Sequence, residues 1–189
     1  MPKANKNILV IVGTVRQNRA SEGVAKWLMQ NLPKTKHTTF ELVDLRDWQL
    51  PFFDEPMPPL ASQGSYAGEL GKKWLEKVAA ADGFIIITGE YNHSVPGVLK
   101  NALDYWYSGL MKGKPVSFVS YGAASGGMRA VEHLRQIVSE LRLIGLHDEV
   151  NIPAIWAAFK EDGSIVDDSK IGQLHNLVTE LDAWFDKRE

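Results

Sequence analysis

Apolar residues fall into short, dense runs that are separated by stretches of helical spacing, and this alternation continues along the whole chain. Four runs, at residues 8–12, 40–43, 84–88 and 116–120, are bounded by Gly, Pro or charged residues and are predicted to be strands. The first and third are apolar at every position, which is typical of parallel strands covered by helices on both faces. A weaker fifth strand is expected at 149–152.

The stretches between these runs carry apolar residues at helical spacing. The first predicted helix begins near Glu22, with Val24, Trp27 and Leu28 on one stripe. Further helices are expected at residues 70–79, 98–106, 128–143 and 168–185. Residues 46–65 contain four prolines and three aromatic residues without periodicity, and they are predicted to form a functional or partner-facing loop.

Regular alternation of strand and helix predicts an α/β fold, a three-layer sandwich in which right-handed crossovers place helices on both faces of a parallel sheet. Five strands favour the order 2-1-3-4-5 over a six-stranded order. The chain has 189 residues, and at roughly 150 residues per domain this length predicts one domain spanning residues 1–189.

Charge and cysteine content narrow the possible functions. Lys and Arg number 21 and Asp and Glu 23, giving a net charge of −2, so no global positive field exists to hold nucleic acid. Cysteine is absent, which excludes disulfides, Cys-ligated zinc and thiol redox chemistry, so redox work requires a bound cofactor. Apolar runs are too short for a membrane span or a secretion signal, and we expect a cytoplasmic protein without a membrane partner.

Ligands of such sheets bind beyond the carboxyl ends of the strands, near the point where the strand order reverses, so the loops after strands 1, 3 and 4 should carry the site. After strand 1, Gly13 permits a tight exit, Thr14 and Ser21 offer hydroxyls, and Arg16 and Arg19 offer charge at a helix N-terminus. This composition fits a phosphate monoester, although it matches neither the P-loop nor the G-x-G-x-x-G motif. The alternative is an ordinary helix start with two solvated arginines.

The loop after strand 3 contains Glu90, Tyr91, Asn92 and His93. Asn92 and the Tyr91 ring are suited to a flat heteroaromatic ligand, by hydrogen bonding and by stacking. The alternative is a turn with a structural tyrosine, and His93 alone is more typical of a loop residue than of a catalyst.

The loop after strand 4 is rich in small residues, which allow a flat ligand to lie against the backbone. The alternative is an ordinary flexible loop between a strand and a helix. Its candidate contacts are Ser120, Tyr121, Gly122 and Ser125. The five histidines are scattered, so no metal site is expected, and no nucleophile elbow occurs. The predicted site therefore binds a molecule that brings its own chemistry.

Three motifs resemble the NADPH-dependent FMN reductases, which include bacterial quinone, azo and chromate reductases. They are G-T-x-R-x-x-R at 13–19, E-Y-N-H-S-x-P-G-x-L-K-N-A-L-D at 90–104, and Ser120 followed by S-G-G-x-R at 125–129. The likeness covers residues 8–156, and L-P-F-F-D-E-P at 50–56 also looks like this family. One departure is Gly89, where the family usually has Pro before the Glu-Tyr-Asn run.

The resemblance implies a flavodoxin-like fold that binds FMN non-covalently and uses NAD(P)H as electron donor. It implies no catalytic side chain and no metal, because the flavin carries the chemistry. The residues that it assigns to FMN are Thr14, Arg16, Arg19 and Ser21 at the phosphate, Glu90, Tyr91, Asn92 and His93 along the isoalloxazine, and Ser120, Tyr121, Gly122 and Ser125 on its other side.

The implied reaction passes hydride from nicotinamide through flavin N5 to quinones, free flavin or similar small acceptors by a ping-pong mechanism. Family members are homodimers or homotetramers in which the helix after the second motif packs on a neighbour. Leu99, Leu103 and Trp106 would serve that packing, or equally would be intrachain core.

Two further expectations stay open at this point. The segment with Trp48, Phe52 and Phe53 would wall the flavin site, from the same or a neighbouring subunit. The alternative functions are a flavodoxin-type electron carrier, which is usually more acidic and has a phosphate loop rich in Thr and Ser, or a non-catalytic flavin-binding regulatory module.

Overall fold

The computed structural model describes residues 5–186, and its centre is one sheet of five parallel strands. The order β2-β1-β3-β4-β5 confirms the prediction. The strands are β1 (Lys6–Val12), β2 (Thr38–Asp44), β3 (Gly83–Gly89), β4 (Pro115–Tyr121) and β5 (Ile144–Ile152).

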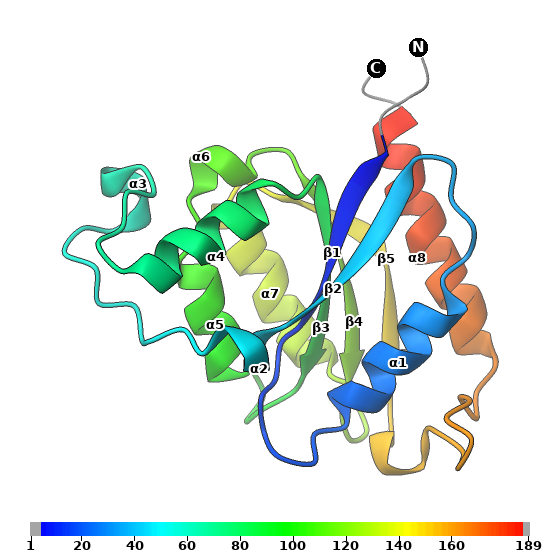
Figure 1. Ribbon diagram of the computed structural model, residues 1–189. Coiled ribbons are helices and arrows are strands. Elements are labelled where there is room, and N and C mark those ends of the chain that lie inside the picture. The colour runs from blue at the N-terminus through cyan, green and yellow to red at the C-terminus, as the bar shows by residue number, and fades with distance from the viewer. Residues whose placement is uncertain (1–4, 187–189) are drawn as a thin grey trace.

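Helices cover both faces of this sheet, which confirms the three-layer sandwich (Figure 1). One layer consists of α1 (Ser21–Asn31) and α8 (Ser169–Asp186). The other consists of α4 (Glu69–Ala79), α5 (Gly97–Asp104) and α7 (Met128–Glu140). Short elements connect them: α2 (Leu45–Trp48), α3 (Pro59–Ser62), α6 (Ser108–Met111) and the 3-10 turn η1 (Ile155–Ala157). No described helix is long and apolar enough to cross a membrane.

The unbroken apolar run of β1 is explained by burial on both of its faces. Leu9 and Ile11 pack into the core beneath α4, α5 and α7, whereas Ile8, Val10 and Val12 pack into the core beneath α1 and α8. Each such side chain contributes about 1.5–3 kcal/mol through burial. β1 lies between β2 and β3 in the sheet, so the loop that follows it leaves the sheet edge beside the ends of both strands.

Two element boundaries differ from the prediction for physical reasons. β5 begins at Ile144, because Ile144 and Gly145 already pair with Pro115 and Val116 at the start of β4. At the register shift that follows, the Glu180 carboxylate accepts from the backbone N–H groups of His147 and Asp148 at 3.1 and 2.7 Å. α7 ends at Glu140, short of residue 143, because Arg142 takes a left-handed φ of +63°.

The Pro-rich segment 46–65 is attached to α5 through Asn101. The Asn101 side chain accepts from the Phe53 N–H at 2.9 Å and donates to the Pro51 carbonyl at 2.8 Å. The Phe53 ring packs against tyrosines of the core, whereas the Phe52 side chain between these two anchors is 84% exposed. The segment is therefore fixed along its first part and contains two short helices, α2 and α3, that periodicity did not reveal.

The apolar stripe of α5 belongs to the core of this chain. Leu99 and Leu103 of α5, and Trp106 just after the helix, are each at most 2% exposed, so these side chains are intrachain core and not a free packing surface. The Trp48 side chain also packs within this chain: its ring lies on that of Trp74 at a centroid distance of 4.9 Å.

Candidate functional site

Three loops leave the same edge of the sheet, at the carboxyl ends of β1, β3 and β4. They are the first loop (13–20), the second loop (90–96) and the third loop (122–127), all at the lower edge of the sheet in Figure 1. Gly13 keeps the first loop close to β3, because its N–H donates to the Ile87 carbonyl at 2.8 Å. A Cβ at Gly13 would lie 2.8 Å from Leu99 Cδ2 and 2.9 Å from the Ile87 oxygen, so only glycine fits.

The first loop offers an unbroken series of free backbone donors. In the described chain, turns form at residues 17–18 and 20, and no backbone N–H from Thr14 through Glu22 makes a well-aligned hydrogen bond to a protein carbonyl. The series ends on the first turn of α1, where the helix dipole also favours negative charge. Arg16 is exposed beside it, and its Nη1 donates to the Gln17 carbonyl at 3.1 Å. This donor set fits a phosphate group.

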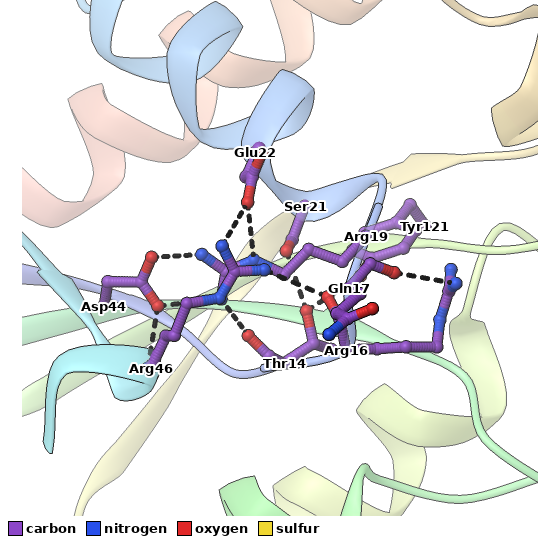
Figure 2. A network of polar contacts seen from close by, with 9 residues as sticks. All are labelled: Thr14, Arg16, Gln17, Arg19, Ser21, Glu22, Asp44, Arg46 and Tyr121. Atoms are coloured by element: carbon purple, nitrogen blue, oxygen red, sulfur yellow. Dashed lines mark hydrogen bonds and ion pairs between the residues drawn. The ribbon is translucent and has the colours of Figure 1, made fainter. Parts of the chain in front are cut away.

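Arg19 is placed differently from Arg16, because its side chain is only 2% exposed (Figure 2). Its guanidinium donates to the Thr14 carbonyl, to both Asp44 oxygens, and through Nε to Glu22 at 3.3 Å. Hydrogen bonding to Asp44 is the main cause that raises the pKa of Arg19 above its ordinary value. Arg19 is therefore not a solvated residue; it ties the end of β2 to the first loop and to α1.

Asp44 and Arg46, which follow β2, complete this network (Figure 2). Burial raises the pKa of Asp44, but hydrogen bonds from Arg19 and from the Arg46 N–H outweigh it, and the net shift is downward. Arg46 donates to Glu22 at 2.7 Å and to the Arg16 carbonyl at 3.0 Å. The sequence analysis missed both residues, although β2 lies beside β1 and ends at the same edge.

The two hydroxyls predicted at the phosphate are turned toward each other. Thr14 Oγ1 lies 2.7 Å from Ser21 Oγ and 3.3 Å from the Tyr121 hydroxyl, and Thr14 and Ser21 are fully buried. Burial is the main cause that raises the pKa of Tyr121, which keeps it a neutral phenol. The three hydroxyls thus brace the base of the first loop, and its open side presents backbone N–H groups and Arg16.

The second loop contains a tight hairpin, residues 90–94, in which Tyr91 and Ser94 exchange backbone hydrogen bonds of 2.9 and 3.0 Å. Asn92 and His93 between them have φ values of +50° and +67°, as a two-residue primed turn requires. Tyr91, Asn92 and His93 are all exposed. In the described chain the Asn92 and His93 N–H groups have no protein acceptor, so the turn offers two further donors beside an aromatic ring.

Glu90 connects the second loop to the third. Its Oε2 accepts from Ser125 Oγ at 2.8 Å and its Oε1 accepts from Arg129 Nη1 at 2.8 Å. Burial raises the pKa of Glu90, but the bonds from Arg129 and Ser125 outweigh it, and the net shift is downward. Glu90 is therefore a carboxylate at neutral pH, and Arg129, which the third motif contains, is a contact that the sequence analysis had not assigned.

The third loop is shaped by small residues and one buried hydroxyl. Ser120 donates to the Gly126 carbonyl at 2.7 Å and accepts from Asn151 at 2.9 Å. Gly127 has a φ of +86°, and a Cβ there would lie 2.8 Å from the Tyr121 carbonyl. Ser120 thus supports the loop from below, whereas Gly122 and Ser125 are partly exposed at its surface.

A segment after β5 lies against the third loop. Ala154 N–H donates to the Ala123 carbonyl at 2.8 Å, and Ile155 N–H donates to the Gly122 carbonyl at 3.1 Å. Trp156 follows on η1 with its indole 76% exposed. No motif distinguished this residue, because its position depends on the pairing of β4 with β5.

Taken together, the edge provides free N–H donors for a phosphate, an exposed aromatic ring with further donors, and a backbone of small residues. This donor set fits FMN, a cofactor that brings its own redox chemistry. Among residues 5–186, no group of three or more His, Asp or Glu is arranged to hold a metal ion.

Comparison with known proteins bears on this site. A sequence model described as NADPH-dependent FMN reductase matches residues 6–184. The chain is 42% identical over 125 residues to an NAD(P)H-dependent FMN reductase of Schizosaccharomyces pombe, a match that spans 66% of this chain and 62% of that protein. It is 30% identical over 192 residues to a 2-hydroxy-1,4-benzoquinone reductase of a Burkholderia species, with 94% of both chains covered.

Among solved structures, the chain resembles the flavoenzyme NAD(P)H:(acceptor) oxidoreductase FerB of Paracoccus denitrificans. The TM-score is 0.74, the identity is 24%, and the match covers 96% of this chain and 98% of that one. At this identity the likeness shows the fold alone, and that fold is the flavodoxin-like sheet described above.

Proposed function

The chain belongs to the NADPH-dependent FMN reductase family and is an oxidoreductase that uses FMN and NAD(P)H, and we propose that it reduces quinones, free flavin or similar small acceptors by a ping-pong mechanism. The observation that carries the proposal is the family match over residues 6–184 together with the free N–H donors of the first loop. Bound FMN supplies the hydride-transfer chemistry.

In this proposal the first loop binds the phosphate. The backbone N–H groups from Thr14 to Glu22 and the exposed Arg16 neutralise and orient it. Arg19, Thr14 and Ser21 act beneath them, because their polar groups already bond within the chain. Their role is to hold the loop in the shape that presents its N–H groups.

The second and third loops bind the ring system. The exposed Tyr91 ring and the N–H groups of Asn92 and His93 contact one side of the isoalloxazine, where donors stabilise the negative charge of the reduced form. The partly exposed Gly122 and Ser125 border the other side, while Glu90, Ser120 and Tyr121 hold these loops from within. No side chain of this chain is required to transfer a proton in the hydride steps.

We also propose that residues 1–189 form a single FMN-binding domain that works in the cytoplasm as a homodimer or homotetramer. Exposed apolar side chains support association. Phe52, Met57 and Leu60 of the Pro-rich segment are 84%, 53% and 71% exposed. Some of this segment borders a groove of about 330 Å³ between the ends of α5 and α7. Light scattering coupled to size exclusion measures the assembly state.

The test of the proposed activity is anaerobic titration of the FMN-loaded protein with NADPH. Loss of the visible flavin band, followed by its return on addition of a benzoquinone, is the expected result. A flavodoxin-type carrier or a non-catalytic module would bind FMN, but its flavin band would persist in NADPH. A protein that takes up no FMN would contradict all three readings.

Initial rates with varied NADPH and quinone test the mechanism. Parallel lines in double-reciprocal plots are expected, because nicotinamide leaves before the acceptor binds. Intersecting lines would contradict the ping-pong mechanism without affecting the activity itself.

A further inference from the structure

α7 contacts the hairpin of residues 90–94 at two points, one on each side of its turn. Arg129 Nη1 donates to Glu90 Oε1 at 2.8 Å, and His133 Nδ1 shares a hydrogen bond of 2.8 Å with Ser94 Oγ. Arg129 and His133 are four residues apart on α7 and therefore lie on one helical face. One face of α7 thus contacts both ends of the hairpin.

The contact at Glu90 also includes the third loop. Each Glu90 oxygen has one side-chain partner, Ser125 on Oε2 and Arg129 on Oε1, and Arg129 Nη1 lies 3.4 Å from Ser125 Oγ. The Glu90 side chain is only 11% exposed, whereas that of Arg129 is 45% exposed. A mostly buried carboxylate therefore joins the two loops assigned to the flavin ring, and Arg129 balances its charge.

The turn between the two anchors has a conformation that needs support. His93 has a φ of +67° and Asn92 a φ of +50°, and non-glycine residues adopt this left-handed region only seldom. Both residues are exposed, so core packing does not hold them. Hydrogen bonds at Glu90, Tyr91 and Ser94 are what keep this turn in place.

We propose that Arg129 and His133 are positioning residues, which hold the hairpin and the third loop at the spacing and orientation that bind the isoalloxazine ring. This inference rests on the proposed function, since it assigns the ring to these two loops. Arg129 acts through Glu90 and Ser125, and His133 acts through Ser94. Because the loops are already ordered, FMN binding costs less conformational entropy, and the affinity is higher.

A double-mutant cycle tests the first arm. The FMN dissociation constant is measured for the wild type, Glu90→Gln, Arg129→Met and the double variant. Each single variant is expected to bind FMN about fivefold more weakly, the most that a partly exposed ion pair usually contributes. The double variant should be no weaker than the worse single one, because both changes break one interaction. Effects that multiply would overturn the proposal.

Conservative variants test the second arm. His133→Asn retains an acceptor near the position of Nδ1 and is expected to keep wild-type affinity, whereas His133→Leu is expected to lose about fivefold. Equal affinity of the two would overturn the role of His133. Lys73→Ala is the control. The Lys73 side chain on α4 is 62% exposed, and its Nζ lies 3.9 Å from Glu69 Oε1, so it makes only a weak surface ion pair.

Two further readouts separate positioning from plain stability. With saturating FMN, Arg129→Met should show a visible flavin spectrum closer to that of free FMN and a lower kcat. The apoprotein of the Glu90→Gln, Arg129→Met double variant, which leaves no unpaired buried charge, should unfold close to the wild-type urea midpoint and still bind FMN more weakly than the wild type. A spectrum and kcat like the wild type, or an affinity loss seen only with a lowered midpoint, would overturn the proposal. Failure of the wild type itself to bind FMN would instead overturn the proposed function.

Discussion

The ring of Tyr121 occupies the space that a side chain at Gly89 would need. The two residues are paired across β3 and β4, and a Cβ built on Gly89 would lie 3.0 Å from both Cζ and the hydroxyl oxygen of Tyr121. Gly89 stands where the family motif usually has Pro, and the phenol beside it reaches Thr14 of the first loop. The departure from the motif and the tyrosine are therefore two parts of one arrangement.

This pairing predicts that Gly89→Ala destabilises the apoprotein by about 1–3 kcal/mol, as overpacking usually does. In a Tyr121→Ser background the same change should cost less than about 0.5 kcal/mol, since the obstructing ring is gone. Urea unfolding gives both values. Gly97→Ala is the control, because a Cβ there meets nothing within 4 Å, and an equal cost at Gly97 would contradict the explanation.

Arg19 and Arg16 should respond differently to removal although they belong to one motif. Arg19→Met should lower the free energy of unfolding by about 2–4 kcal/mol, because it leaves Asp44 without its main charged partner. Arg16→Ala should change it by less than about 0.5 kcal/mol, since Arg16 is exposed. Chemical denaturation of the apoproteins measures both, and comparable losses would contradict the structural role of Arg19.

Removing Arg16 should weaken FMN binding more than removing an ordinary surface cation does. Arg16→Ala is expected to weaken FMN binding about fivefold at low salt and less at high salt, because an exposed charge is screened. Lys26→Ala, an exposed cation on α1, removes the same charge away from the loop and should leave affinity unchanged. Fluorescence titration of the apoproteins with FMN at two salt concentrations distinguishes these outcomes.

The Arg19–Asp44 pair also predicts a pH dependence. Because the folded-state pKa of Asp44 lies below its ordinary value of 3.8, its charged form stabilises the fold fully above that value. The stabilisation is lost as the pH falls through the lowered pKa. The difference in unfolding free energy between wild type and Asp44→Asn should therefore be largest near pH 7 and should shrink as the pH falls below 3.8. A difference independent of pH would contradict the pairing.

Much of the fold could be predicted because its determinants are local. The apolar runs of β1 and β3 indicate strands that are covered on both faces, and their order follows from right-handed crossovers. β5 was shortened in the prediction because its first half pairs with β4, and its backbone N–H groups at His147 and Asp148 bond to Glu180, through contacts that are remote in sequence. The helices α2 and α3 are each a single turn, too short for a period to appear.

The candidate site was predictable as a set of loops, but the division of labour within it was not. Sequence spacing shows that Arg16 and Arg19 share a loop, and it does not show that Asp44 lies beside only one of them. The same limit applies to Glu90, whose partner Arg129 lies on another helix. Which polar groups remain free for a ligand depends on contacts between distant segments, and those contacts decide each residue's role.

The exposed indole of Trp156 gives the chain an optical probe of its own. The turn that carries it is bonded to Gly122 and Ala123, so displacement of the third loop also moves this tryptophan. Trp27, Trp74 and Trp106 are buried in the core, and Trp48 and Trp184 are only partly exposed. A soluble quencher reaches Trp156 most readily, and the difference in quenched emission between the wild type and Trp156→Phe therefore reports on the third loop without any added label.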